Sequence, residues 1–270
     1  MREPLSEALS QVERLRIDGD ADARTDADTV IAETAVALLY NGHPHAVMMA
    51  TPADLQDFAL GFALGEGIVA DPGEFNLVDT VRHVDGIALH GAIPQARFDA
   101  LDTRRRGIAG RSGCGLCGVE SIEAAMRPPP LVAATTRFDR RDVSHALDLL
   151  SSHQPLNDAS GGVHAAGLFD PQSGVLLVRE DVGRHNAVDK LVGALAHAGR
   201  DASAGFLVIT SRASYEIVHK AATSGIGLVV AISAPTDLAI ATARSAGLTL
   251  AAFARGGALN IYSHPHRVDT

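Results

Sequence analysis

The chain has no tryptophan, and aromatic residues make up only 4% of its 270 positions. Proteins that bind single-stranded nucleic acid stack bases on aromatic side chains, so this shortage disfavours that class. The formal net charge of −9 also argues against a general nucleic-acid binder, because phosphate backbones attract cationic surfaces. We therefore expect no nucleic-acid partner.

Long apolar runs are missing as well. No stretch approaches the roughly 18 apolar residues that a membrane helix needs, and the best apolar segments, such as residues 225–233, have the length of a strand. Residues 1–28 carry many charges and no apolar core, so they do not read as a signal peptide. We expect a cytoplasmic protein that does not enter the membrane.

Cysteine is scarce, and both cysteines lie in the tetrapeptide Cys114-Gly115-Leu116-Cys117. A disulfide-rich secreted scaffold is therefore excluded, and a working dithiol in a reducing compartment is expected. The Cys-X-X-Cys arrangement is one setting in which the pKa of a thiol falls toward neutrality. Flanking glycines leave room for another molecule, and four upstream arginines would favour a thiolate: Arg104, Arg105, Arg106 and Arg111.

The order of patterns along the chain divides it into four parts. Residues 1–28 are expected to form a flexible acidic lead, and residues 29–102 a small α+β domain. In that domain the pattern predicts strands at 29–40 and 46–50, joined by an Asn41-Gly42 turn, then a helix at 52–69 and a hairpin at 78–89. Residues 103–130 form a Cys-X-X-Cys loop and connection, and residues 131–270 an α/β domain.

Helices and strands alternate in the last of these parts, which predicts helices packed on a mixed, largely parallel sheet. The expected helices are 143–152, 186–198, 214–223 and 236–245. The expected strands are 162–169, 174–179, 205–210, 226–232 and 248–253.

Polar residues gather where four of these strands end. The four segments are 180–186, 211–214, 233–236 and 253–258. Since the carboxyl ends of parallel strands share one rim of a sheet, we expect these segments to meet there and bind a ligand. Arg184 and Arg212, with helix N-termini behind them, suit a phosphate-bearing ligand. No segment has the P-loop or Gly-X-Gly-X-X-Gly pattern, so ordinary ATPase or NAD chemistry is unsupported.

Simpler structural roles are open for several of these residues. Arg184 and Arg212 are also compatible with surface ion pairs, and Gly256-Gly257 with a plain turn. His164 is compatible with a buried, hydrogen-bonded strand residue, and His264-Pro265-His266 with either metal binding or an exposed tail. Two cysteines alone do not make a structural zinc site, so we expect no permanently bound metal.

Several long motifs together resemble one known family, the formate dehydrogenase accessory sulfurtransferases (FdhD). The resemblance spans about residues 30–267 and includes the Cys-Gly-X-Cys loop. Its further motifs are Ala46-Val47-Met48-Met49-Ala50, Phe58-Ala59-Leu60-Gly61-Phe62, Glu66-Gly67-Ile68, Gly161-Gly162-Val163-His164-Ala165-Ala166, Glu180-Asp181-Val182-Gly183-Arg184-His185-Asn186-Ala187-Val188-Asp189-Lys190, Ser211-Arg212-Ala213-Ser214-Tyr215-Glu216 and Tyr262-Ser263-His264-Pro265.

The resemblance implies a sulfurtransferase that works with two other proteins. It would accept persulfide sulfur from a cysteine desulfurase and pass it to the molybdenum cofactor, bis(molybdopterin guanine dinucleotide), of formate dehydrogenase. A homodimer is implied too. By the same resemblance Cys114 carries the persulfide, and Cys117 is a secondary cysteine for relay or tuning. The cofactor-binding stretch falls on Phe253, Ala254, Arg255, Gly256, Gly257 and Ala258.

The resemblance also implies that the C-terminal part has a cytidine-deaminase-like fold. Deaminase chemistry is not expected, because a zinc deaminase needs His-X-Glu followed by a downstream Cys-X-X-Cys. Here His164 precedes Ala165-Ala166, and the cysteine pair lies upstream. Two other functions stay open: a thioredoxin-like dithiol oxidoreductase, and a non-catalytic molybdenum-cofactor chaperone. Against the first, the cysteines do not follow the opening strand of a thioredoxin-like unit.

Overall fold

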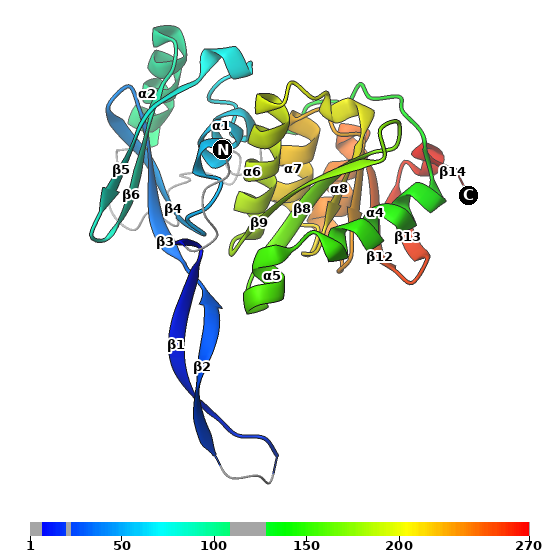
Figure 1. Ribbon diagram of the computed structural model, residues 1–270. Helices are drawn as coiled ribbons and strands as arrows, with labels where there is room; N and C mark the ends of the chain where they lie inside the picture. The colour runs from blue at the N-terminus through cyan, green and yellow to red at the C-terminus, as the bar shows by residue number, and fades with distance from the viewer. Residues whose placement is uncertain (1–6, 20–22, 109–127, 270) are drawn as a thin grey trace.

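The computed structural model describes residues 7–19, 23–108 and 128–269 (Figure 1). Two sheets and their helices build the body, and a two-stranded arm projects from it. The sequence-based prediction of a small α+β part followed by an α/β part therefore agrees with the order of the elements.

A six-stranded sheet forms the centre of the C-terminal part, with strand order β13-β12-β11-β10-β8-β9. Its strands are β8 (His164–Asp170), β9 (Val175–Asp181), β10 (Phe206–Ile209), β11 (Leu228–Ala231), β12 (Thr249–Arg255) and β13 (Ala258–Ser263). Strands β10, β11 and β12 are parallel, whereas β8 is antiparallel to both of its neighbours and β13 is antiparallel to β12. The sheet is mixed, as expected, but three of its five strand pairings are antiparallel, so it is not largely parallel.

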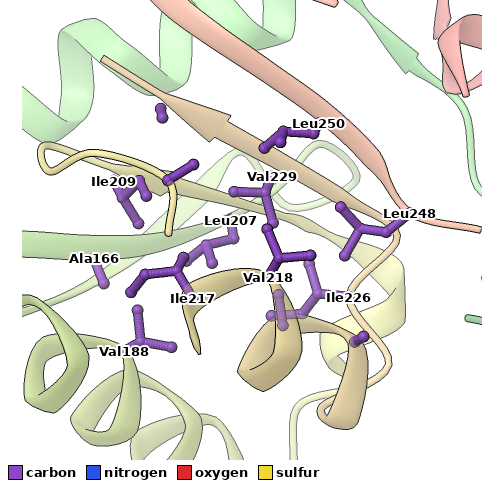
Figure 2. Packing of buried hydrophobic residues seen from close by; sticks show 14 of the residues in the cluster. Ala166, Val188, Leu207, Ile209, Ile217, Val218, Ile226, Val229, Leu248 and Leu250 are labelled. Carbon is purple, nitrogen blue, oxygen red and sulfur yellow. The ribbon is translucent and has the colours of Figure 1, made fainter. Parts of the chain in front are cut away.

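Helices cover both faces of this sheet. One face carries α6 (Arg184–His197), α7 (Tyr215–Thr223) and α8 (Asp237–Ala246), and the other carries α4 (Arg140–Ser152). The four-residue strands β10 and β11 are buried at every position, as expected of strands covered on both faces. Figure 2 shows the core on the α6–α7 side, where Ile217 and Val218 of α7 pack against Leu207 and Val229.

The N-terminal part has a four-stranded sheet of order β4-β3-β6-β5 with α1 (Leu55–Gly65) on one face. Its strands are β3 (Thr34–Tyr40), β4 (His43–Ala50), β5 (Asn76–His83) and β6 (Gly86–Ala92). The predicted Asn-Gly turn joins β3 to β4, with Asn41 at φ 49° and Gly42 at φ 83°. Helix α2 (Gln95–Ile108) continues past residue 102, so the connection begins later than expected.

Residues 9–16 and 24–28, expected within a flexible lead, lie in strands. Strand β1 (Leu9–Arg16) pairs antiparallel with β2 (Arg24–Ile31) in an arm that points away from the body in Figure 1. Arg14 bridges Asp26 at 2.8 Å and Asp28 at 2.7 Å across the two strands. The charges that resemble a solvated acidic lead in sequence are therefore cross-strand partners.

Several short elements complete the fold, and sequence periodicity missed most of them because each is brief. They are α5 (Pro155–Ser160), the paired strands β7 (Phe138–Asp139) and β14 (Val268–Asp269), and the 3-10 turns η2 (Pro72–Glu74), η3 (Ala202–Ala204) and η4 (Pro265–Arg267).

Helices α1 and α6 join the two halves of the body through an unusually close crossing. A Cβ atom on Gly61 would lie 1.7 Å from the carbonyl oxygen of Asp189, and one on Gly193 would lie 1.9 Å from that of Asp57. Neither position tolerates a side chain unless the backbones separate. The two glycines therefore allow the helices to approach this closely.

Candidate functional site

The expected rim of strand ends forms as predicted. Strands β9, β10, β11 and β12 all run in one direction, so the segments that follow them lie along one edge of the sheet. Backbone hydrogen bonds tie these segments to one another. Ala213 N–H donates to the Ala234 carbonyl at 3.1 Å, and Phe253 N–H donates to the Ser233 carbonyl at 3.1 Å.

The predicted cofactor stretch, residues 253–258, is the end of β12 and the turn into β13. A bulge lies between Ala252 and Arg255, and Phe253 adopts a left-handed backbone with φ 53°. An aromatic residue rarely takes this conformation, and such strain gathers at ligand-binding sites. Gly256 and Gly257 form the turn with φ 59° and 78°, so the simpler role predicted for them, a turn, is also confirmed. The Phe253 side chain is 38% exposed at the rim, whereas Ala254 is buried.

The two predicted arginines lie on this same rim with different exposures. Arg184 begins α6 and is partly buried, and its Nε has no hydrogen-bond partner among the described residues. Arg212 follows β10 and is exposed, with no ion pair among those same residues. A buried N–H without an acceptor is costly, so Arg184 is ready to bind an oxyanion.

A cluster that the sequence did not assign lies beside Arg184. His185 Nε2 is 2.9 Å from Glu216 Oε2, and the Ser214 hydroxyl donates to the same oxygen at 3.1 Å. These contacts, the hydrogen bond from His185 first, lower the pKa of Glu216 to about 2. His185, Ser214 and Glu216 all belong to the two long motifs after β9 and β10, which was the only signal for them.

His164 begins β8 opposite Asp181 at the end of β9, so it belongs to the rim and not to mid-strand. It is partly buried. Burial, reinforced by the nearby positive charges of Arg184 and His185, lowers the pKa of His164. A neutral imidazole is therefore favoured at the rim near neutral pH.

Buried ion pairs support the rim from behind. Lys190 and Asp181 are both 0% exposed and lie 2.6 Å apart, and Asp181 also accepts hydrogen bonds from the backbone of Thr51 and Gly183. The Lys190 ammonium donates to the Thr51 carbonyl at 2.9 Å. Asp181 thus attaches α6 to the N-terminal part.

A second group of charges is built on Asp189, the residue that precedes Lys190 on α6. Lys220 pairs with Asp189 at 2.8 Å and with Glu66 at 2.8 Å. Complete burial raises the pKa of Asp189 to about 6 against the attraction of Lys220. Although burial opposes it, the two carboxylates raise the pKa of Lys220. These charges connect α1, α6 and α7; Lys220 and Asp189 are buried, whereas the Glu66 side chain is 38% exposed.

Cys114 and Cys117 lie outside the described residues. The structure thus places the predicted Arg184, Arg212 and residues 253–258 along one edge of the sheet, with three strands between β9 and β12, and gives no position for the cysteines. Within the described ranges, His, Cys, Asp and Glu do not gather in any group of three that could hold a metal ion. No helix in those ranges is long and apolar enough to cross a membrane.

The fold is that of a two-part α/β protein with polar strand ends along one edge of a sheet. Comparisons with known proteins agree on the family to which it is related. The family model "FdhD/NarQ family" matches residues 31–269. "Sulfur carrier protein FdhD" of Xanthomonas euvesicatoria pv. vesicatoria is 54% identical over 260 residues, which cover 96% of this chain and 92% of that protein. The protein of the same name from Bordetella petrii is 47% identical over 255 residues, 94% of this chain and 92% of its own length.

A solved structure shares the whole fold. The crystal structure of a putative formate dehydrogenase accessory protein from Desulfotalea psychrophila superposes with a TM-score of 0.74 and covers 97% of this chain and 100% of that one. Its sequence identity is 22%, so it supports the fold alone. The chain belongs to the FdhD/NarQ family.

Proposed function

We propose that the protein is a sulfur carrier that activates formate dehydrogenase. It accepts sulfur from a cysteine desulfurase on Cys114 and transfers it to the bis(molybdopterin guanine dinucleotide) form of the molybdenum cofactor. Relatives of 54% and 47% identity are named sulfur carrier proteins, and this likeness carries the proposal. A cytidine-deaminase-like C-terminal layer, a cytoplasmic location and a homodimer are parts of the same proposal.

Sulfur acceptance on Cys114 is a simple exchange at sulfur. The Cys114 thiolate attacks the outer sulfur of the donor's persulfide and forms a new S–S bond, and the donor cysteine leaves as a thiolate. No net oxidation occurs, so no further reagent is needed. Cys117 serves as the secondary cysteine for relay or tuning.

The rim is proposed to hold the guanine dinucleotide portion of the cofactor. Arg184, whose buried Nε meets no acceptor in the described part of the chain, and the exposed Arg212 suit phosphate oxygens. The exposed ring of Phe253 offers a surface on which a purine stacks. The remaining residues of the 253–258 turn have little or no side chain except Arg255, so the ligand can approach their backbone.

Mass spectrometry of intact protein and peptides tests the carrier step. After incubation with a cysteine desulfurase and cysteine, we expect one added sulfur atom on Cys114, absent in Cys114→Ala and retained in Cys117→Ala. Formate dehydrogenase activation should be lost in Cys114→Ala. If Cys114→Ala still accepts sulfur and still yields active formate dehydrogenase, the proposal fails.

Calorimetry measures the binding of GDP and of ADP to the rim, separately from the carrier step. We expect GDP to bind, with an affinity about tenfold lower in Arg184→Ala, since a charge-assisted hydrogen bond contributes about 1.5–3 kcal/mol. Equal binding of GDP by wild type and by Arg184→Ala would remove Arg184 from the site. A redox titration of the thiols distinguishes the thioredoxin-like alternative, which requires a Cys114–Cys117 disulfide with a defined potential.

A further inference from the structure

Strand β9 is the last strand of the six-stranded sheet, and on its far side no strand of the described chain pairs with it. Its first residues, Val175-Leu176-Leu177-Val178, are all apolar. An unpaired strand presents a row of N–H and C=O groups, to which another extended chain can pair. We call residues 175–178 the free edge of β9.

The hydrogen bonds of β8 establish which peptide groups of β9 face outward. The N–H of Ala165 donates to the Thr210 hydroxyl at 2.9 Å, and its carbonyl accepts from the Thr210 N–H at 3.1 Å, so both groups point toward β10. Ala165 lies opposite Glu180 on β9. Because peptide groups alternate in direction along a strand, those of Glu180, Val178 and Leu176 point away from β8. No described residue accepts a hydrogen bond from the N–H of Leu176 or Val178.

The other edges of the two larger sheets carry features that oppose such pairing. Strand β4 contains Pro44, which has no N–H, and β5 carries Asp79 and Arg82. Strand β13 shifts its register against β12 at two places. Prolines, charges and bulges are the means by which proteins protect sheet edges. Residues 175–178 have none of them, since they are apolar and follow β8 in an unbroken register.

A hollow of about 550 Å³ lies beside the free edge, between β9, the end of α4 with the start of α5, and the residues that precede α1. Its wall includes Asp54, Arg179 and Glu180. Arg179 lies 2.7 Å from Asp57, which balances its charge. The carboxylates of Asp54 and Glu180 therefore give the wall an excess of negative charge, which suits a segment with a basic side chain.

Few of the polar groups along the free edge are already engaged. The Arg179 guanidinium donates to the Val178 carbonyl at 2.8 Å, and Nδ1 of His153, on the wall of the hollow, is 2.7 Å from the Leu149 carbonyl. The two outward N–H groups and the Leu176 carbonyl remain for a partner. An alternating set of donors and acceptors in one line is matched by the backbone of another extended segment.

The position of the free edge relative to the rim indicates which partner it serves. Strand β9 ends at Asp181, and Arg184 of the rim follows three residues later. A protein that receives the cofactor has to approach the rim, and a segment paired along β9 would hold it there. We propose that an extended segment of formate dehydrogenase, carrying a basic side chain, pairs with the free edge of β9 as an additional strand. This docking site rests on the proposed function and adds the surface through which the recipient binds.

Hydrogen exchange of the full chain, followed at single amides, is the first test. The probe is formate dehydrogenase purified from cells that lack this carrier. We expect the amides of Leu176 and Val178 to exchange rapidly in the free protein and at least about tenfold more slowly in the complex. The amides of Leu177 and Arg179, which face β8, serve as the internal control and should be slow in both states. Slow exchange at Leu176 and Val178 in the free protein, no slowing by formate dehydrogenase, or slowing by cysteine desulfurase instead would overturn the proposal.

Two substitutions at one position test the backbone pairing by biolayer interferometry with the same formate dehydrogenase. Val178→Pro removes an outward N–H without removing a hydrogen bond to β8, and it should weaken binding at least about tenfold. Val178→Ala is the matched control, since it also loses the valine side chain but keeps the N–H, and it should bind close to wild type. Equal affinities of the two variants would refute strand pairing. The exchange measurement on wild type covers the case in which Val178→Pro fails to fold.

Asp54→Asn tests the charge match. Asparagine has the shape of aspartate and tolerates the left-handed backbone of this position, with φ 52°, so the fold should persist while formate dehydrogenase binds several-fold more weakly. Unchanged affinity would refute the basic side chain. Sulfur acceptance on Cys114 should be normal in all three variants. If wild type accepts sulfur but its free edge stays unprotected, the docking site fails and the carrier role stands; if wild type accepts no sulfur, the proposed function fails.

Discussion

The α1–α6 contact and the rim of strand ends lie on the two sides of helix α6. Charged side chains are paired and buried at the contact, whereas at the rim they are exposed or only partly hydrogen-bonded. At the contact, Lys190 and Asp181 are completely buried and surrounded by partners from three elements. At the rim, Arg212 is exposed and Arg184 keeps an N–H that no described residue accepts. Polar groups that are satisfied internally hold the two halves together, and those left partly unsatisfied remain for a ligand.

This contrast separates stability from function along a single stretch of sequence. The segment from Glu180 to Lys190 carries both kinds of residue, and the rotation of α6 directs them apart. Substitutions at the contact should therefore change stability strongly, and substitutions at the rim should change binding with little effect on folding. Four predictions test this division.

The largest loss of stability is expected for Lys190→Met. It leaves the Asp181 carboxylate buried without its cation, which costs about 3–5 kcal/mol. Urea unfolding followed by circular dichroism measures the free energy of unfolding. The double variant Lys190→Met/Asp181→Asn, which removes both charges, should recover part of the loss. A single variant within about 1 kcal/mol of wild type would show that the pair does not hold the contact.

Gly61→Ala is expected to destabilise by about 3 kcal/mol, because its Cβ would meet the Asp189 carbonyl at 1.7 Å. The direction of the change in stability makes this a sharp test. In an exposed helix, alanine is more favourable than glycine by about 1 kcal/mol. The control Ala241→Gly, at an exposed position of α8, should lose only that amount. Thermal unfolding compares the two, and a stabilised Gly61→Ala would mean that the helices are further apart.

The pH dependence of Asp189 gives a smaller effect. Its pKa is about 6 in the fold, against 3.8 for an unperturbed aspartate side chain, so the folded state holds the proton more tightly. Between these values the unfolded state binds fewer protons, and stability contributed by this group falls as pH rises from about 4 to 6. We expect this decrease in stability, about 2 kcal/mol between pH 4 and 6, to be absent in Asp189→Asn. Parallel slopes for variant and wild type across that window would contradict the assignment.

The smallest stability effect is expected at the rim. Arg212→Ala should leave the free energy of unfolding within about 0.5 kcal/mol, since its side chain is exposed. It should nevertheless weaken GDP binding several-fold, measured by calorimetry. Arg140→Ala on α4 provides an exposed arginine as control and should change neither quantity. If Arg212→Ala is strongly destabilised and binds GDP normally, the rim residue contributes to stability and not to binding, which contradicts the prediction.

Part of this arrangement was predictable because it depends on local patterns. Apolar runs bounded by turns located β8 to β12, and the rule that parallel strands end on one rim predicted that Arg184, Arg212 and residues 253–258 meet. The arm was missed because its charges pair across strands and leave no apolar period. Strand β13 was missed because its six residues mix polar and apolar side chains, and its pairing with β12 forms only in the folded chain.

By itself the sequence determined the family, the types of reactive residue and the order of helices and strands, because these depend on residue identity and on short-range periodicity. Only the tertiary structure decided which polar residues serve the fold and which face a ligand. Asp181 and Arg184 are three residues apart and equally polar, yet one is buried in an ion pair and the other lies at the rim. Burial and partners come from segments more than a hundred residues away, such as Thr51, and no local pattern records them.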